Sequence, residues 1–180
     1  MNEIDLKNLI EEVVLKFNKN RTGTKPIVIV TVPSEVPNLS SQDARLAKLL
    51  RLFLYEVLLM NEPEAPVQLL VHKRSRLRDL EAFVGVSPQY WIQLRIAAHG
   101  PCIPEKLIEE RSREVDYRCE EWVGVEDSDA QLVILSPMNA NGQKMVFCVD
   151  ASKRIRKCDF LIPVNQPASF AVYSNERKRF

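Results

Sequence analysis

Apolar positions at helical spacing predict two helices, and a proline marks the start of a third. In residues 3–18, apolar side chains recur at the i, i+3, i+4 and i+7 positions of one helix face. Between residues 42 and 60 a wider apolar stripe is interrupted by single charged residues, which is typical of a helix with one buried face. A shorter helix is predicted for residues 104–113, because Pro104 suits the first turn of a helix, where its missing N–H is not needed.

Runs of β-branched and aromatic residues predict strands. The first is IVIVTV at residues 27–32, bounded by glycine and proline on one side and by a proline-containing loop on the other. Further strands are predicted at residues 67–73, 90–96, 130–137, 144–150 and 157–164. The segment MNANGQ between two of them contains Asn-Gly and predicts a hairpin turn. The segment YRCEEWVGV at 117–125 is ambiguous.

This order of elements predicts the fold class and its organisation. Helices and strands alternate irregularly, and the last three predicted strands follow one another, which favours an α+β two-layer sandwich. We expect a mixed, mostly antiparallel sheet with helices on one face. The chain is divided into an N-terminal helix (1–20), a main domain (27–164) and a polar tail (165–180) that is expected to fray.

Composition excludes several classes of protein. The chain has 180 residues, is 46% hydrophobic and 27% charged, and carries a net charge of +1, so no global field attracts nucleic acid or an anionic membrane. No apolar stretch approaches the roughly 20 residues that cross a bilayer, and the acidic N-terminus is unlike a secretory signal. We therefore expect a cytoplasmic protein that does not bind membranes.

The cysteines and histidines do not predict a metal site. Four cysteines are scattered without any CxxC spacing, and the chain has two histidines. In a reducing cytosol the cysteines are expected to behave as small apolar residues. We expect neither a metal nor another cofactor.

The segment AAHGPCIPEKL at residues 97–107 comes closest to chemistry. It follows the predicted strand YWIQLRI and precedes a predicted helix. It is open to three interpretations: a nucleotide-binding loop that has lost its ligands, a reactive Cys-His site, or a plain turn into a helix. In the second, His99 and Cys102 stand three residues apart and the cysteine lies beside a helix N-terminus, where a thiol pKa falls. No third, orienting residue is recognisable.

Three segments in this order carry a family resemblance. QDARLAKLLRLFLYEV is similar to the family helix D..RL...L.NLL.NA, AHGPCIP is similar to the loop D-x-G-x-G-I, and KCDFLIPV is similar to the last strand, TFTFTLPV. With these segments, residues 27–164 resemble the ATP-binding domain of histidine kinases, the family shared with gyrase, Hsp90 and MutL. Arg45, Leu46, Gly100, Pro101, Ile103 and Pro104 fall in register.

The departures from the family pattern bear on function. The family's adenine-binding carboxylate falls on Ala98, the next loop glycine falls on Cys102, and the helix asparagines fall on Leu52 and Glu56. The glycine-rich lid has no counterpart. A charge-assisted hydrogen bond is worth about 1.5 to 3 kcal/mol, so losing the base contact alone weakens binding by about one to two decades. The resemblance therefore implies a pseudo-ATPase, whose degenerate nucleotide pocket comprises Leu52, Glu56, Ala98, His99, Gly100 and Cys102.

The basic run HKRSRLR is a second candidate site. Its cationic side chains are candidate anion-binding groups: Lys73, Arg74, Arg76 and Arg78. Interleaved aromatic residues are missing and Asp79 and Glu81 dilute the charge, so a solvated loop is the plainer interpretation and nucleic-acid binding is not expected.

The function predicted from the sequence is a non-catalytic regulatory or signalling module that binds another protein. The resemblance implies this role, because kinase-type ATPase domains dock onto helical dimerisation segments and response regulators. The N-terminal helix packs either on its own sheet or on a partner helix, and a homodimer through it stays open. The alternatives are a small-molecule- or nucleotide-binding protein, a weak Cys-His enzyme, and a nucleic-acid-binding protein that uses residues 72–78.

Overall fold

The structure is a computed structural model that describes residues 2–23, 26–41, 44–125, 128–139, 144–150 and 155–165. Within these ranges the helices are α1 (Leu6–Asn20), α2 (Arg45–Met60), α3 (Arg78–Val84) and α4 (Glu105–Glu114). The strands are β1 (Asn2–Ile4), β2 (Val28–Thr31), β3 (Leu39–Ser41), β4 (Val67–Arg74), β5 (Tyr90–His99), β6 (Tyr117–Gly124), β7 (Ala130–Pro137), β8 (Met145–Asp150) and β9 (Ile155–Val164).

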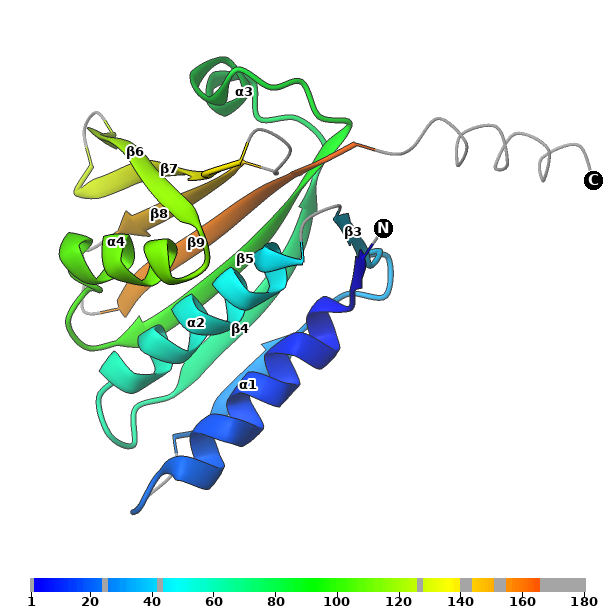
Figure 1. Ribbon diagram of the computed structural model, residues 1–180. Coiled ribbons are helices and arrows are strands. Elements are labelled where there is room, and N and C mark those ends of the chain that lie inside the picture. The colour runs from blue at the N-terminus through cyan, green and yellow to red at the C-terminus, as the bar shows by residue number, and fades with distance from the viewer. Residues whose placement is uncertain are drawn as a thin grey trace, which may run out of the picture.

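A seven-stranded sheet forms one layer of the molecule. Its order is β2-β4-β5-β9-β8-β7-β6, and β1 pairs separately with β3. The β2–β4 pair is parallel, and the other neighbours in the sheet are antiparallel. Helices α1, α2 and α4 form the second layer, in front of the sheet in Figure 1. The predicted α+β class and the mixed, mostly antiparallel sheet are confirmed.

The main core lies between the sheet and these three helices. Alternate residues of β5 point into it, including the fully buried Ile92, Leu94 and Ile96. Phe53 of α2 packs on Phe147 and Phe160 of the sheet, with ring centroids 5.3 and 5.7 Å away. In the predicted apolar stripe of α1, Ile10, Val13 and Phe17 are buried in this same core and Val14 is partly buried against it. The stripe is therefore used within the chain itself.

Helix α3 packs on the opposite face of the sheet and was not predicted. Val84 joins Trp91, Ile134 and Val146 in a second, smaller core. A buried carboxylate organises the start of the helix, because Glu81 Oε2 accepts the Leu77 N–H at 2.9 Å and Glu81 also pairs with Arg76. Gly85 ends the helix in the left-handed region, at φ 76°. Seven residues are too few for a readable helical period.

The remaining elements follow the predicted outline with local differences. The ambiguous segment is strand β6, which is bulged between Cys119 and Trp122. Strands β7 and β8 pair antiparallel as predicted, although the Asn-Gly turn itself lies outside the described residues. The polar tail beyond Asn165 also lies outside them.

The candidate site at the end of strand β5

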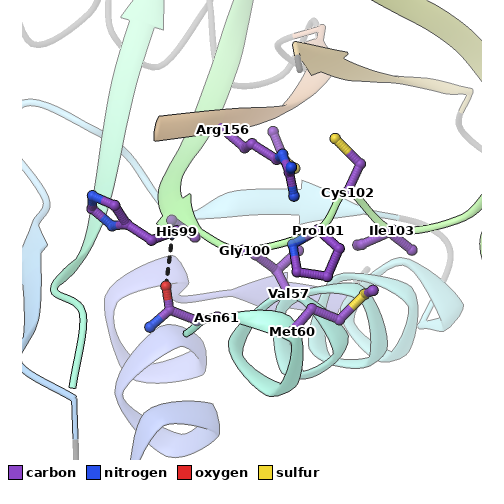
Figure 2. Close-up of a pocket in the computed structure, with 11 residues that line it drawn as sticks. Val57, Met60, Asn61, His99, Gly100, Pro101, Cys102, Ile103 and Arg156 are labelled. Carbon is purple, nitrogen blue, oxygen red and sulfur yellow. Dashed lines mark hydrogen bonds between the residues drawn. The ribbon is translucent and has the colours of Figure 1, made fainter. Parts of the chain in front are cut away.

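The segment singled out from the sequence, residues 97–107, divides among the end of strand β5, a loop and the first turn of helix α4. Ala98 and His99 belong to β5, where they pair with Arg156 and Ile155 of β9. The pairing with β9 extends β5 three residues beyond the predicted end, so the loop before α4 consists of residues 100–104. We call these five residues the β5–α4 loop. Figure 2 shows the first four of them, residues 100–103, lying against the C-terminal end of α2.

Gly100 makes this close approach feasible. Its φ of 141° lies in a region that favours glycine, and a Cβ added there would overlap the carbonyl oxygen of Met60. The glycine that falls in register with the nucleotide-binding family therefore faces the backbone of helix α2 in this chain. The space left by the missing side chain of Gly100 is therefore occupied by the backbone of Met60.

Asn61 fastens the loop to the helix. Its Oδ1 accepts the His99 N–H at 2.8 Å, as drawn in Figure 2. Its Nδ2 donates to the carbonyl oxygens of Glu62 at 3.0 Å and Ala65 at 2.9 Å. The Glu62 N–H donates a hydrogen bond to the His99 carbonyl oxygen. Asn61 is buried, so one side chain satisfies three backbone groups and fixes the end of β5 to the end of α2.

The cavity left beneath the loop is small. Its volume is about 20 Å³, and its lining residues are Val57, Met60, Asn61, Ala98, His99, Gly100, Pro101, Cys102, Ile103, Arg156 and Cys158. This is room for about one water molecule, whereas pockets for small molecules usually measure about 300 to 1,000 Å³. The region that the family resemblance assigns to a nucleotide is thus nearly filled.

The structure gathers only part of the predicted pocket. Ala98, His99, Gly100 and Cys102 line the cavity together. Leu52 instead lines a groove between α1 and α2. Glu56 faces α4, where its Oε1 accepts from Arg111 Nε at 2.7 Å. The two helix positions therefore contribute to helix packing and not to the cavity.

His99 and Cys102 do not face one another. Figure 2 shows the imidazole of His99 directed away from the Cys102 thiol, and His99 Nδ1 lies 3.1 Å from the Pro66 carbonyl oxygen. Burial raises the pKa of Cys102, with a smaller opposing effect from Arg156. A thiol in this setting stays protonated near neutral pH and is a poor nucleophile.

Arg156 is a site residue that the sequence analysis missed. It lines the cavity, and its Nε and Nη1 are buried without a hydrogen-bond partner in the part of the chain that the structure describes. In the sequence it belongs to the polar segment SKRIRK, where nothing distinguishes it from a solvated cation. Asn61 was also missed. An asparagine just past a helix is a helix-end signal, but its partner His99 lies 38 residues away.

The basic run does not form a single cationic site. Lys73 stacks over the ring of Tyr90, 4.5 Å from its centroid, and Arg76 pairs with Glu81. Arg74 Nε donates to Gln93 Oε1 at 2.9 Å. Arg74 and Arg78 line one cleft beneath α3, whereas Lys73 and Arg76 do not line it.

The described residues hold neither a metal-binding cluster nor a membrane-spanning helix. No group of three or more His, Cys, Asp or Glu side chains is placed to hold a metal ion. None of the helices has the length and apolar character needed to cross a bilayer.

Comparisons with known proteins found similar folds. No family model and no curated protein matches the chain. Among solved structures, the mycobacterial sensor histidine kinase MprB matches at 11% identity and a TM-score of 0.46, over 92% of this chain and 99% of that one. The catalytic domain of the histidine kinase ThkA, in a nucleotide-free form, matches at 12% identity and a TM-score of 0.45, over 91% and 95%. Both are histidine kinases, the family that the sequence resembles, and both likenesses concern the fold.

Proposed function

We propose that this chain is a non-catalytic module that has lost nucleotide binding and acts by binding another protein. The observation that carries the first half of the proposal is the closure of the β5–α4 loop onto α2. The Gly100 backbone meets the Met60 carbonyl, Asn61 fastens His99, and the space left is about 20 Å³.

The side chains around the loop support the same proposal. Ala98 stands at the position of the family carboxylate and has no polar group to offer a base. Glu56 stands at a position of a family asparagine and is engaged by Arg111 of α4. Opening the loop for a nucleotide would break the Asn61 hydrogen bonds and expose the apolar contacts beneath them.

The edge strand β2 supports the second half of the proposal. It is the last strand of the sheet, and among the described residues it pairs with β4 alone. The neighbouring Ile27 and Ile29 leave 68% and 48% of their surface exposed. An unpaired strand edge with exposed β-branched side chains is suited to receive an extended segment of another protein. We propose that the partner docks there by adding a strand.

Thermal unfolding with and without Mg²⁺-ATP or Mg²⁺-ADP tests the loss of nucleotide binding. A ligand at a hundred times its dissociation constant adds about 2.7 kcal/mol of stability, which raises the Tm of a chain of this size by about 5 to 10 °C. We expect no shift at millimolar nucleotide. A saturable rise in Tm with either nucleotide would contradict the proposal.

Site-specific crosslinking tests the docking edge. A photoreactive amino acid replaces Ile29 in one variant and the exposed Glu11 of α1 in a control. In cells that express the chain, we expect a discrete adduct with one protein from position 29 and not from position 11. Equal labelling from both positions, or none from position 29, would contradict docking at β2.

A further inference from the structure

A cleft lies between α3 and the sheet face that α1, α2 and α4 leave uncovered. Its volume is about 750 Å³, within the roughly 300 to 1,000 Å³ of small-molecule sites. Figure 1 shows α3 apart from the other helices, at the upper end of the sheet. We propose that this cleft, which we call the α3 cleft, binds an amphiphilic carboxylate with an apolar body and a single anionic head. The proposal is independent of the proposed function.

Apolar side chains form most of the cleft. Leu77, Leu80 and Phe83 line it on the side of α3, and Leu132 and Leu161 line it on the side of the sheet. Phe83 leaves 38% of its surface exposed, more than an aromatic side chain buried in a core. Covering these groups with a ligand's apolar body removes them from water, which favours binding.

Polar donors converge on one part of this apolar surface. Gln93 is 95% buried in the sheet, since only 5% of its surface is exposed, and it lines the cleft. Its Oε1 accepts from Arg74 Nε, and its amide nitrogen donates to no other group in the described part of the chain. An amide nitrogen at the wall of a cleft, beside an arginine, is a ready partner for a carboxylate oxygen.

The charge of the lining selects a monoanion. Arg74 and Arg78 contribute two positive charges and Asp79 one negative charge, so the lining carries a net +1. Within the described residues, neither arginine has a carboxylate within ion-pair distance. The terminal nitrogens of Arg74 are therefore available to a ligand while Gln93 fixes its Nε. One carboxylate head matches this charge, and Asp79 opposes a dianion.

Competition between two probes tests the proposal on the full chain. The first is 8-anilino-1-naphthalenesulfonate, an anionic aromatic dye whose fluorescence rises in apolar surroundings. The second is dodecanoate, kept below its micellar concentration. We expect dodecanoate to displace the dye and dodecyltrimethylammonium, which has the same tail and the opposite charge, to bind at least about tenfold more weakly. Equal affinity for the two amphiphiles, or no dodecanoate binding at about 1 mM, would overturn the proposal.

A pair of variants locates the site. R74Q/R78Q removes both guanidinium groups, and K7Q/K48Q removes two exposed lysines from α1 and α2 with the same change in net charge. We expect the first pair to weaken dodecanoate binding about tenfold or more and the second pair to leave it unchanged. Similar losses in both pairs would show a general charge effect and overturn the assignment.

A measurement on the unmodified chain guards against misfolding of a variant. The side-chain amide of Gln93 gives a pair of NMR signals that report directly on its surroundings. Dodecanoate is expected to shift these signals and to leave the side-chain amide of Asn61, on the other side of the sheet, unchanged. Signals of Gln93 that do not move while dodecanoate binds would place the ligand elsewhere and overturn the proposal.

Discussion

Replacing Asn61 by aspartate exchanges the side-chain amide that joins the end of β5 to the end of α2 for a carboxyl group of almost the same shape. The carboxylate keeps an acceptor for the His99 N–H but loses both donors, so the carbonyl oxygens of Glu62 and Ala65 face an oxygen. A buried polar group left without its partner costs about 1 to 3 kcal/mol. Two carbonyl oxygens lose their donor, and Glu62 is exposed while Ala65 is partly exposed, so we take about 1 kcal/mol for each, the lower end of the range, and expect a loss of about 2 kcal/mol in the free energy of unfolding.

The size of this loss should depend on pH. A carboxyl directed at two carbonyl oxygens has its pKa raised, because the protonated form donates to one of them and the charged form is opposed by both. A group whose pKa is raised on folding stabilises the folded chain below its unfolded-state pKa, about 3.9 for aspartate. That stabilisation is lost as the pH rises through the folded-state pKa. The difference between N61D and the parent chain is therefore larger at about pH 7 than at about pH 4.5.

Urea denaturation at the two pH values measures both effects. N165D is the matched control, since Asn165 is exposed at the end of β9, and it should change stability by less than about 0.5 kcal/mol. An N61D chain as stable as N165D at neutral pH would refute the role assigned to Asn61. A loss that is the same at both pH values would refute the account of the carboxyl.

Three further predictions concern stability. A glycine series should be graded: G124A changes little, because its Cβ meets nothing; G85A loses about 1 kcal/mol from backbone strain; and G100A loses about 3 kcal/mol or more, because strain and overlap with Met60 combine. Equal losses for G85A and G100A in urea denaturation would contradict the close approach of the loop. Burial raises the pKa of Cys148 to about 11 and of Cys158 to about 12, so the unfolded chain loses these thiol protons first and stability falls as the pH rises above about 9. C158A should make the free energy of unfolding decrease less steeply with pH above about 9. An unchanged slope would contradict the contribution of the Cys158 thiol. E56Q should lower stability by about 1 kcal/mol by weakening the contact with Arg111, more than E114Q at the exposed end of the same network; calorimetry compares the two, and the reverse order would be inconsistent with a helix–helix role for Glu56.

The sequence predicts the elements whose apolar pattern repeats. Helices α1 and α2 each bury a long stripe of apolar side chains. In the strands of the main core, apolar residues either alternate with polar ones or form a continuous run. Both patterns can be recognised in the sequence alone. Helix α3 could not be predicted, because it has seven residues and its start depends on the buried Glu81 carboxylate. The sequence predicts the end of β5 three residues too soon, because the last residues up to His99 are held in the strand by pairing with β9 and not by their local propensity.

The site is less readable than the fold. The sequence pointed to Ala98, His99, Gly100 and Cys102, which do gather at one cavity. Residues that close this cavity or line it come from distant parts of the chain, and a side chain such as Asn61 or Arg156 shows its partners only after folding. The α3 cleft escaped prediction for the same reason, because Gln93 and Arg74 meet only through the pairing of β4 with β5.

The edge strand β2 has a consequence for the chain when it is alone. Under the proposed docking, the backbone edge of β2 that receives the partner's strand is also open to a second copy of this chain, and the exposed Ile27 and Ile29 add apolar surface to such a contact. When no partner covers it, this edge favours self-association and precipitation as the protein is concentrated. A partner bound at β2 would prevent this self-association.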